Sequence, residues 1–230
     1  MRQGLRILVA ATLEACLAAL LDPPWMWVVG YIALVTGLVG LCAMAGWPHL
    51  LAKRLDGTVP WWSLVVFWPW HGMTRAILAL RRLGSEPLTA EIHPGWLLGG
   101  WPHDRALWSQ WPAVVDLTCE LPRRGPEQPY LCLPTWDGTA PRQEDIRRGV
   151  AFAVEQRAKG RSVLVHCAAG HGRSATVLAA ALVEAGLHAT WQEAVAHMRS
   201  VRPGVGLVTE QRAALHEWAA ASGGEHGTGD

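Results

Sequence analysis

Residues 163–174 read Val-Leu-Val-His-Cys-Ala-Ala-Gly-His-Gly-Arg-Ser, a short apolar run followed by one cysteine and, six positions later, one arginine. The apolar run predicts a buried strand, and the residues after Arg173 predict a helix. Between them, Gly170 and Gly172 allow a loop whose backbone N–H groups turn toward one anion. The positive end of the helix and the guanidinium of Arg173 would face the same anion. The stretch therefore predicts a phosphate-binding loop that follows a central strand and holds a cysteine.

This arrangement resembles the signature of the cysteine-dependent protein tyrosine phosphatase superfamily, which is His-Cys, five residues, Arg, then Ser or Thr. The matching residues are His166, Cys167, Arg173 and Ser174. The resemblance implies that Cys167 is a nucleophile ionised near neutral pH, that His166 orients the loop, and that Ser174 donates a hydrogen bond to the sulfur. The loop residues implied to bind the phosphate are Ala168, Ala169, Gly170, His171, Gly172 and Arg173. The alternative interpretation is a buried strand that ends in a free cysteine.

Phosphoryl transfer also needs a proton for the departing oxygen. Asp137, in the segment Pro-Thr-Trp-Asp-Gly at 134–138, lies upstream of the cysteine at a spacing that resembles the compact, dual-specificity-like branch of the superfamily. The segment departs from the Trp-Pro-Asp form of the larger phosphatases, because no proline separates the tryptophan from Asp137. Asp137 is the predicted general acid, and a simple turn residue is the alternative interpretation. Asp116 and Asp145 are the other candidate acids.

The resemblance implies a reaction in two steps. Cys167 attacks a phosphomonoester while Asp137 protonates the leaving oxygen, and Asp137 then activates the water that hydrolyses the phosphocysteine. Arg173 and the loop amides stabilise the charge on the phosphoryl oxygens. We expect no metal and no cofactor, because the ten histidines are scattered and no cysteine pair has zinc-site spacing.

The first 50 residues are strongly apolar. Residues 5–21 are nearly all apolar, an Asp-Pro-Pro sequence at 22–24 interrupts any helix, and residues 25–46 carry no charge. About 20 apolar residues are enough to cross a bilayer, so the pattern predicts a transmembrane helical hairpin in residues 1–50. Two other interpretations are a secretory signal peptide in residues 1–21 and two buried core helices of a soluble protein.

The distribution of basic residues predicts how the hairpin is oriented. The basic residues that flank it are Arg2, Arg6, Lys53 and Arg54, and the loop between its helices has none. The positive-inside rule then places both ends, and the catalytic domain, in the cytoplasm. A reducing compartment suits a catalytic thiolate, and the five cysteines show no pairing pattern. Some relatives form a reversible disulfide at an oxidised nucleophile, and Cys119 or Cys132 could play that role for Cys167; ordinary core cysteines are the alternative.

Residues 51–85 form a linker of unusual composition. Residues 58–72 hold four tryptophans and two prolines, which suit the lipid headgroup layer, and residues 73–83 place three arginines among apolar residues, as in an interfacial amphipathic helix. We therefore expect the linker to lie on the membrane surface. A third span, with the catalytic domain on the far side, is the alternative.

Net charge divides at the end of this linker. Residues 1–85 hold seven Arg or Lys and three Asp or Glu, a net charge of +4, whereas residues 86–230 carry a net charge of −3. A basic half near the membrane suits anionic lipid headgroups. An acidic catalytic half gives no reason to propose a nucleic-acid partner.

The catalytic domain is expected over residues 86–221, followed by a disordered tail at 222–230. Residues 91–100 predict a first strand and a turn. The other predicted strands are 113–118, 129–133 and 162–166, and the predicted helices are 141–159, 173–186, 189–201 and 207–221. Strands that alternate with helices predict an α/β fold, a central mixed sheet flanked by helices as in the dual-specificity phosphatases that the chain resembles.

Two substrate classes and one non-enzymatic function fit these features. A phosphorylated protein and a phospholipid, such as phosphatidylglycerophosphate or a phosphoinositide, are both compatible with a shallow site at a membrane. The tryptophan-rich segment favours lipid, whereas Ala168, Ala169 and His171 replace the lysines that relatives acting on polyphosphorylated inositides carry. An inactive phosphate-binding scaffold is the third interpretation, but such proteins usually lose the cysteine, the arginine or the acid, and this chain keeps all three.

Overall fold

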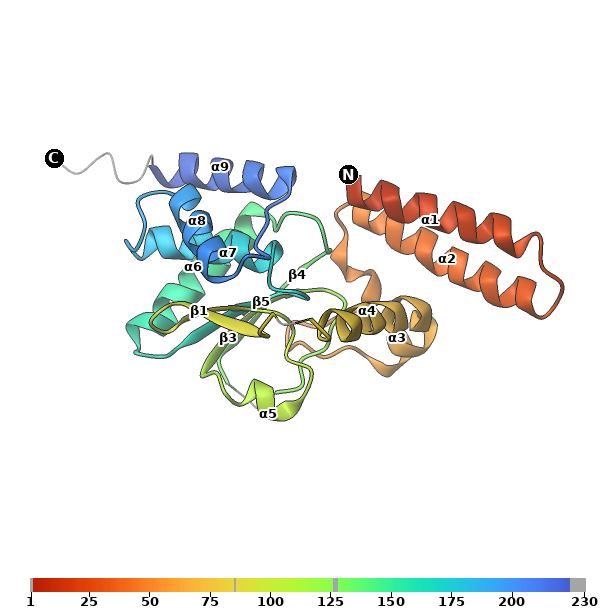
Figure 1. Ribbon diagram of the computed structural model, residues 1–230, viewed down its shortest axis with the longest axis horizontal. Coiled ribbons are helices and arrows are strands. Elements are labelled where there is room, and N and C mark those ends of the chain that lie inside the picture. Colours follow the sequence, from red (N-terminus) through yellow and green to blue (C-terminus); the bar gives the residue numbers. More distant parts are fainter. Residues whose placement is uncertain (1, 85, 126–127, 224–230) are drawn as a thin grey trace.

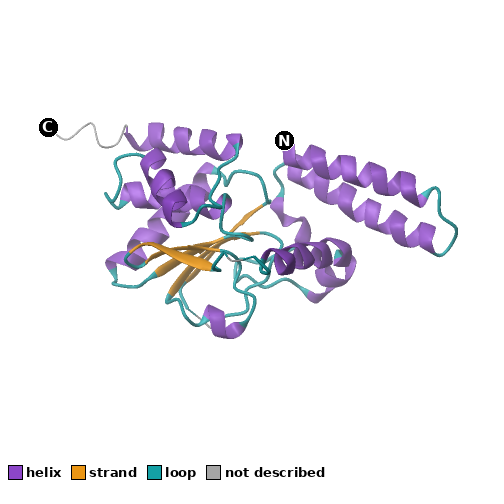
Figure 2. Cartoon of the chain, viewed as in Figure 1, coloured by secondary structure: helices purple, strands orange, loops and turns teal. Residues whose placement is uncertain are grey.

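The computed structural model describes residues 2–84, 86–125 and 128–223. Figure 1 shows a pair of long helices that begins at the N-terminus and projects from one side of a sheet covered by helices. A short helical linker joins the two parts. Figure 2 shows that the strands form the interior of the second part and the helices its outside.

The sheet has five strands in the order β1-β2-β5-β3-β4. Their bounds are β1 Thr89–His93, β2 Trp96–Gly99, β3 Ala113–Thr118, β4 Tyr130–Thr135 and β5 Val163–His166. β1 pairs antiparallel with β2 and the other pairs are parallel, so the predicted mixed sheet is confirmed. The segment 91–100, predicted as one strand and a turn, holds parts of two strands, because Pro94 and Gly95 (φ +79°) reverse the chain between β1 and β2.

Four helices cover one face of the sheet (Figure 1). They are α6 Gln143–Ala158, α7 Arg173–Glu184, α8 Trp191–Val201 and α9 Thr209–Gly223, and each bound lies within two residues of its prediction. Val163 and Val165 of β5 are fully buried against these helices. Leu164 points to the other face, where α5 (Arg105–Trp108) contributes Trp108 to a second core. The predicted tail began at Ser222, which instead belongs to α9, and residues 224–230 lie outside the described residues.

The predicted hairpin consists of α1 (Arg2–Ala18) and α2 (Trp25–Met44). A Cβ on Gly4 would lie 2.9 Å from the carbonyl oxygen of Gly40, so small residues bring the two helices into close contact. Among the described helices, α2 alone is long and apolar enough to cross a membrane, a criterion that buried core helices and signal sequences also meet.

The linker holds η1 (Pro48–Leu51), α3 (Trp61–Val66) and α4 (Trp68–Arg81). The helix predicted at 73–83 begins earlier, at Trp68, because Pro69 occupies the first turn, where a missing N–H breaks no helical hydrogen bond. The tryptophan-rich segment is therefore helical. One buried apolar cluster joins hairpin, linker and sheet domain, and its residues are Val35, Val39, Ala43, Leu51, Phe67, Cys119 and Trp136.

Candidate active site

The predicted phosphate loop connects β5 to α7 and passes over the end of β2. Its fold depends on Gly170, which has a φ of +80° and whose added Cβ would lie 2.4 Å from the carbonyl carbon of Gly99. Only glycine fits there. The Cys167 N–H donates to the Gly99 carbonyl (3.3 Å), and the Trp101 N–H donates to that of Ala168 (3.0 Å). These contacts fix the loop against the neighbouring strand.

Cys167 lies at the start of the loop, with 3% of its surface exposed. Its Sγ accepts hydrogen bonds from the Gly170 N–H and from the Ser174 hydroxyl, both at 3.2 Å. The geometry thus brings Cys167, Ser174 and the loop backbone together, as the sequence predicts.

Arg173 begins α7 and is almost fully buried. Glu120 accepts two hydrogen bonds from its guanidinium, at 2.9 and 3.1 Å, and the carbonyls of Leu117 and Thr135 accept two more. Burial alone would lower the pKa of Arg173, but the charges of Glu120, Asp137 and Cys167 outweigh it and raise the pKa well above its usual range. The Nε–H of Arg173 has no partner among the described residues, so it is free to contact a substrate phosphate.

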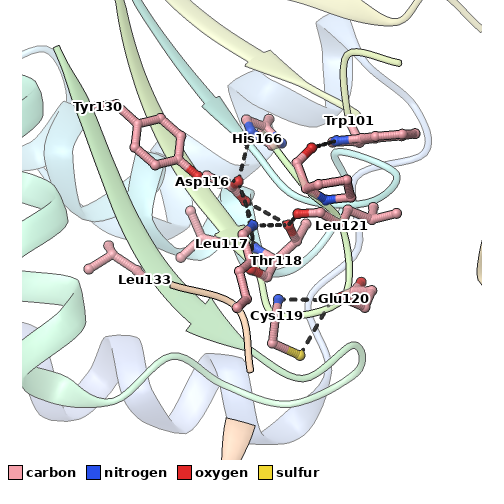
Figure 3. Close-up of polar contacts among 12 residues, drawn as sticks. Trp101, Asp116, Leu117, Thr118, Cys119, Glu120, Leu121, Tyr130, Leu133 and His166 are labelled. Atoms are coloured by element: carbon pink, nitrogen blue, oxygen red, sulfur yellow. Dashed lines mark hydrogen bonds and ion pairs between the residues drawn. The ribbon is translucent and has the colours of Figure 1, made fainter. Parts of the chain in front are cut away.

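Glu120 was not predicted from the sequence. It follows β3 closely, at the carboxyl end of the parallel strands where the phosphate loop also lies, and this position is the only sequence signal for it. Figure 3 shows Glu120 beside Cys119, whose backbone N–H (2.9 Å) and thiol (3.4 Å) both contact its carboxylate. Burial raises the pKa of the Cys119 thiol well above its usual range.

Asp137, the predicted acid, has an exposed side chain whose Oδ1 lies 3.0 Å from Nη2 of Arg173. The N-terminal part of the chain supports its loop. The Trp136 indole N–H donates to the Trp47 carbonyl (2.9 Å), and Arg142 donates to the Gly46 carbonyl (2.9 Å). A Cβ on Gly138 would lie 3.0 Å from the side chain of Gln3, so the start of α1 also lies against this loop.

A fully buried ion pair lies behind the phosphate loop, and Figure 3 shows its carboxylate, Asp116, near Tyr130 and His166. Lys53 Nζ lies 2.6 Å from Asp116 Oδ2, and both side chains are fully buried. The Tyr130 hydroxyl donates to the same carboxylate (2.7 Å), and His166 Nε2 lies 3.7 Å from it. Burial works to raise the pKa of Asp116, but the charges of Lys53 and His166 and the hydrogen bonds outweigh it, so the pKa lies below its usual range. Asp116 is therefore a buried structural anion, which disfavours it as the acid.

The structure also places the other predicted histidines, the other candidate acid and the cysteines. Burial lowers the pKa of His166, which contacts the Cys167 carbonyl through Nδ1 at 3.2 Å. His171 Nε2 lies 2.7 Å from the Glu86 carboxylate. Asp145, the other candidate acid, lies on α6 and pairs with Arg148. None of the five cysteines forms a disulfide in this structure. A reversible disulfide between Cys167 and Cys119 or Cys132 stays a prediction.

Arg202 stabilises the phosphate loop through hydrogen bonds to its backbone carbonyls. It was not predicted from the sequence. It lies immediately after α8 and donates to the carbonyls of Ala169 (3.0 Å), Gly170 (3.2 Å) and Pro87 (2.7 Å). These bonds use its charge to hold loop carbonyls away from the anion site, so that the loop N–H groups face inward.

Two cavities lie beside the phosphate loop, and α4 contributes to both. The first, of about 300 Å³, lies between α1, α4 and the loop, and the second, of about 590 Å³, lies between the end of α4 and the segment around Glu86. The side chains that line the first are mainly apolar: Ile7, Ala10, Trp70, Met73, Ile77, Leu78 and Trp136. Arg6 and Arg81 also line it, and Glu120 and Asp137 form its catalytic end.

Comparisons with known proteins show similarity to dual-specificity phosphatases. Residues 110–221 match the model of the dual specificity phosphatase catalytic domain. The chain is 30% identical over 213 residues to the rat phosphatidylglycerophosphatase and protein-tyrosine phosphatase 1, covering 91% of this chain and 93% of that protein. It is 38% identical over 96 residues to the Arabidopsis thaliana phosphatidylglycerophosphate phosphatase PTPMT2, covering 40% of this chain and less than half (41%) of the relative. The crystal structure of PTPMT1 in complex with PI(5)P superposes with a TM-score of 0.55 at 25% identity, covering 61% of this chain and 99% of that one.

Proposed function

The chain belongs to the dual-specificity branch of the cysteine-dependent phosphatases, and we propose that it hydrolyses the phosphate monoester of a membrane glycerophospholipid. The observation that carries this proposal is the apolar cavity that leads from α1 and α4 to Asp137 and Glu120. A phosphoprotein phosphatase needs only an open site, whereas an apolar cavity formed with a candidate membrane hairpin suits an acyl chain. The names of the rat and Arabidopsis relatives point to the same substrate class.

The chemistry follows from the contacts of the loop. The Cys167 thiolate attacks phosphorus, the bond to the leaving oxygen breaks, and Asp137 in its acid form gives that oxygen a proton. The incoming phosphate would take the free Nε–H of Arg173 and the Nη2–H that Asp137 shares, which releases Asp137 toward the leaving group. Asp137 then takes a proton from water as the water attacks phosphorus and the P–S bond breaks. The Ser174 hydroxyl, 3.2 Å from Sγ, stabilises the departing thiolate.

The cavity offers groups for each part of a phosphatidylglycerophosphate. Ile7, Met73 and Ile77 offer apolar contact to an acyl chain, and Arg6 and Arg81 offer charge to a phosphodiester. Arg81 also lines the second cavity, so a headgroup would lie next to the loop and the acyl chain toward the hairpin. The apolar walls come from the segments predicted to touch the membrane, which is where such a substrate resides.

We also propose that α1 and α2 cross the membrane as a hairpin, with α4 on its surface and the catalytic domain in the cytoplasm. α2 meets the length and apolarity required of a span, and outward-facing side chains of both helices, such as Leu13, Trp27 and Leu34, are large, apolar and exposed. Exposed tryptophans of the linker, such as Trp61 and Trp68, suit the headgroup layer.

Phosphotyrosine protein is the second candidate substrate, because the rat relative's name includes a protein-tyrosine phosphatase. An inactive phosphate-binding scaffold is disfavoured, since Cys167, Arg173 and Asp137 lie together in one site.

The test is phosphate release by the full-length protein in lipid vesicles, with phosphatidylglycerophosphate, a phosphotyrosine peptide and a soluble aryl phosphate as substrates. Ile77→Gln, which places an amide in the apolar cavity, should lower kcat/KM for the lipid by about tenfold and leave the aryl phosphate unaffected. Leu80→Gln is the matched control, because Leu80 is exposed on α4 and does not line the cavity.

Each outcome separates the alternatives. An equal loss of kcat/KM for the lipid in Ile77→Gln and Leu80→Gln would mean that α4 binds the membrane and not the acyl chain. A clear preference of the parent protein for the phosphotyrosine peptide would replace the lipid proposal with the protein phosphatase. No release from any of the three substrates would favour the scaffold.

A further inference from the structure

Three histidines that are distant in the sequence meet at one edge of the sheet. His93 ends β1, which is an edge strand, His188 lies in the turn between α7 and α8, and His197 lies on α8. One ring nitrogen from each lies within 4.8 Å of the others, and all three side chains are half-buried. The histidines are scattered in the sequence, with 95 residues between the first two of these three, and only the folded chain brings them together.

We propose that His93, His188 and His197 bind a divalent transition-metal ion of the zinc type. Imidazole nitrogen is the ligand that such ions favour, and three histidines with one open position form a complete protein ligand set. The Nε2 atoms of His93 and His188 lie 3.0 Å apart. Two nitrogens that share a tetrahedral zinc at about 2.0–2.1 Å would lie about 3.3 Å apart, so this pair already stands close to ligand geometry.

The third ring is held in the tautomer that a ligand needs. His197 Nε2 lies 3.1 Å from the carbonyl oxygen of Ile92, which can only accept a hydrogen bond. Nε2 therefore carries the proton, and Nδ1 keeps a free lone pair. A ring N–H bonded to a backbone carbonyl is the usual outer contact of a metal-binding histidine. The widest nitrogen separation, 4.8 Å at most, must shrink by about 1.5 Å on binding, which half-exposed side chains can reach by rotation.

The charges around the cluster are compatible with a cation. An imidazole binds a metal ion in its neutral form, so each of the three rings would bind through an unprotonated nitrogen. His188 and His197 contact each other edge to face, with ring centroids 5.3 Å apart.

An ion at this site would stabilise elements that support the phosphate loop. It would join β1, the α7–α8 turn and α8. Arg202 follows α8 directly and holds the carbonyls of Ala169 and Gly170 in the loop and of Pro87 just before β1. The ion is therefore structural: it should raise Tm, and it takes no part in the chemical step.

The test uses the full-length protein in detergent, carrying Cys167→Ser so that the nucleophilic sulfur cannot bind the metal. After treatment with a chelator, the protein is titrated with Zn²⁺ by calorimetry and with Co²⁺ by visible absorption, which reports tetrahedral coordination. We expect one equivalent to bind and Tm to rise. His188→Gln and His197→Gln should each weaken binding at least tenfold, while leaving the metal-free Tm close to that of the parent, because both side chains are half-exposed.

His103→Gln is the matched control, because His103 is exposed, belongs to no cluster of this kind among the described residues, and should bind like the parent. Absence of stoichiometric binding, or binding that survives both His188→Gln and His197→Gln, would overturn the proposal. Neither result would decide the proposed phosphatase activity, because none of the three histidines belongs to the phosphate loop.

Discussion

Asp137 is exposed and lies 3.0 Å from Arg173, so one small displacement by a substrate phosphate would free it to reach the leaving oxygen. Asp137→Asn removes the proton and should lower turnover by about 10²–10⁴-fold. The loss should grow as the leaving group becomes more basic, because a poor leaving group needs the proton most. The measurement is kcat for a series of aryl phosphates whose phenols differ in pKa.

Asp145→Asn is the control for that series, since Asp145 is the other candidate acid outside the buried core of the site. It is half-buried on α6, where burial raises its pKa and Arg148 pairs with it. It should leave the dependence on the leaving group unchanged. If Asp137→Asn keeps nearly full activity on a basic leaving group, the acid assignment is wrong.

Glu120 should be as important for turnover as the residues of the signature. It binds the Arg173 guanidinium through both carboxylate oxygens, and this pairing directs the remaining N–H groups toward the phosphate position. Glu120→Gln removes the charge and one of the two hydrogen bonds, so we expect kcat to fall by about 10- to 100-fold through misplacement of Arg173. Steady-state kinetics on an aryl phosphate measures it, with Glu144→Gln on the surface of α6 as control. An unchanged kcat would show that the carbonyls of Leu117 and Thr135 position Arg173 without Glu120.

The signature residues could be predicted from the sequence because they lie close together in it. Cys167, Arg173 and Ser174 lie in one loop, and Asp137 follows a predicted strand. Glu120 and Arg202 could not be found this way, because their contacts with Arg173 and with the Gly170 carbonyl span 53 and 32 residues. No local sequence pattern marks a side chain whose partner is that distant. Their positions depend on the packing of β3 and α8 around the loop.

At the scale of elements, α4 illustrates what hydrophobic periodicity misses. Three arginines among apolar residues predict a surface helix, and most of α4 is exposed, yet His71 and Leu78 are buried against the sheet domain. A lone histidine in an apolar stretch gives no signal of its burial, because its environment is set by segments such as α3 that fold over it. Ser63 of α3 lies 3.4 Å from the His71 ring.

Buried His71 should make the protein sensitive to acid. Burial, and then the charge of Arg75, lower its pKa from 6.5 to about 4. Between those values the unfolded chain binds a proton that the folded chain does not, so the free energy of unfolding falls as the pH falls from about 6.5 to about 4. The full effect of a shift this size is about 3 kcal/mol. Burial shifts His166 in the same direction, so part of the dependence will remain in any His71 variant.

The measurement is the free energy of unfolding against pH for the parent, His71→Gln and His49→Gln. His71→Gln should flatten the curve between pH 6.5 and 4, and His49→Gln, at an exposed position in η1, should not. Identical slopes in the parent and His71→Gln would mean that His71 titrates normally in the folded protein.

At the scale of the whole molecule, the hairpin and the linker are more than an extension of the catalytic domain, because they also contact its catalytic loops. Segments 46–47 and Gln3 contact the loop of Asp137, and Lys53 enters the core behind His166. The division predicted at Glu86 stays a prediction, and these contacts cross it. The sequence shows that the linker is basic and apolar, but it does not predict that Lys53 is buried. The partner of Lys53, Asp116, lies 63 residues away, so the local sequence around the lysine contains no sign of the ion pair.

Lys53 therefore provides the sharpest test of how the two parts depend on each other. Lys53→Met keeps most of the side-chain volume but leaves the Asp116 carboxylate buried without its cation, which should lower the free energy of unfolding of the sheet domain by about 3–5 kcal/mol. Adding Asp116→Asn should recover most of that loss, since it removes the uncompensated charge. Arg54→Met, at the exposed neighbouring position, should have little effect. Urea unfolding in detergent, followed by tryptophan fluorescence, compares the four proteins. If Lys53→Met and Arg54→Met have the same free energy of unfolding, the ion pair does not couple the linker to the sheet domain. If only Lys53→Met is destabilised and Asp116→Asn restores its stability, the ion pair does couple them. A chain that begins at Glu86 lacks Lys53 and should then be unstable for the same electrostatic reason.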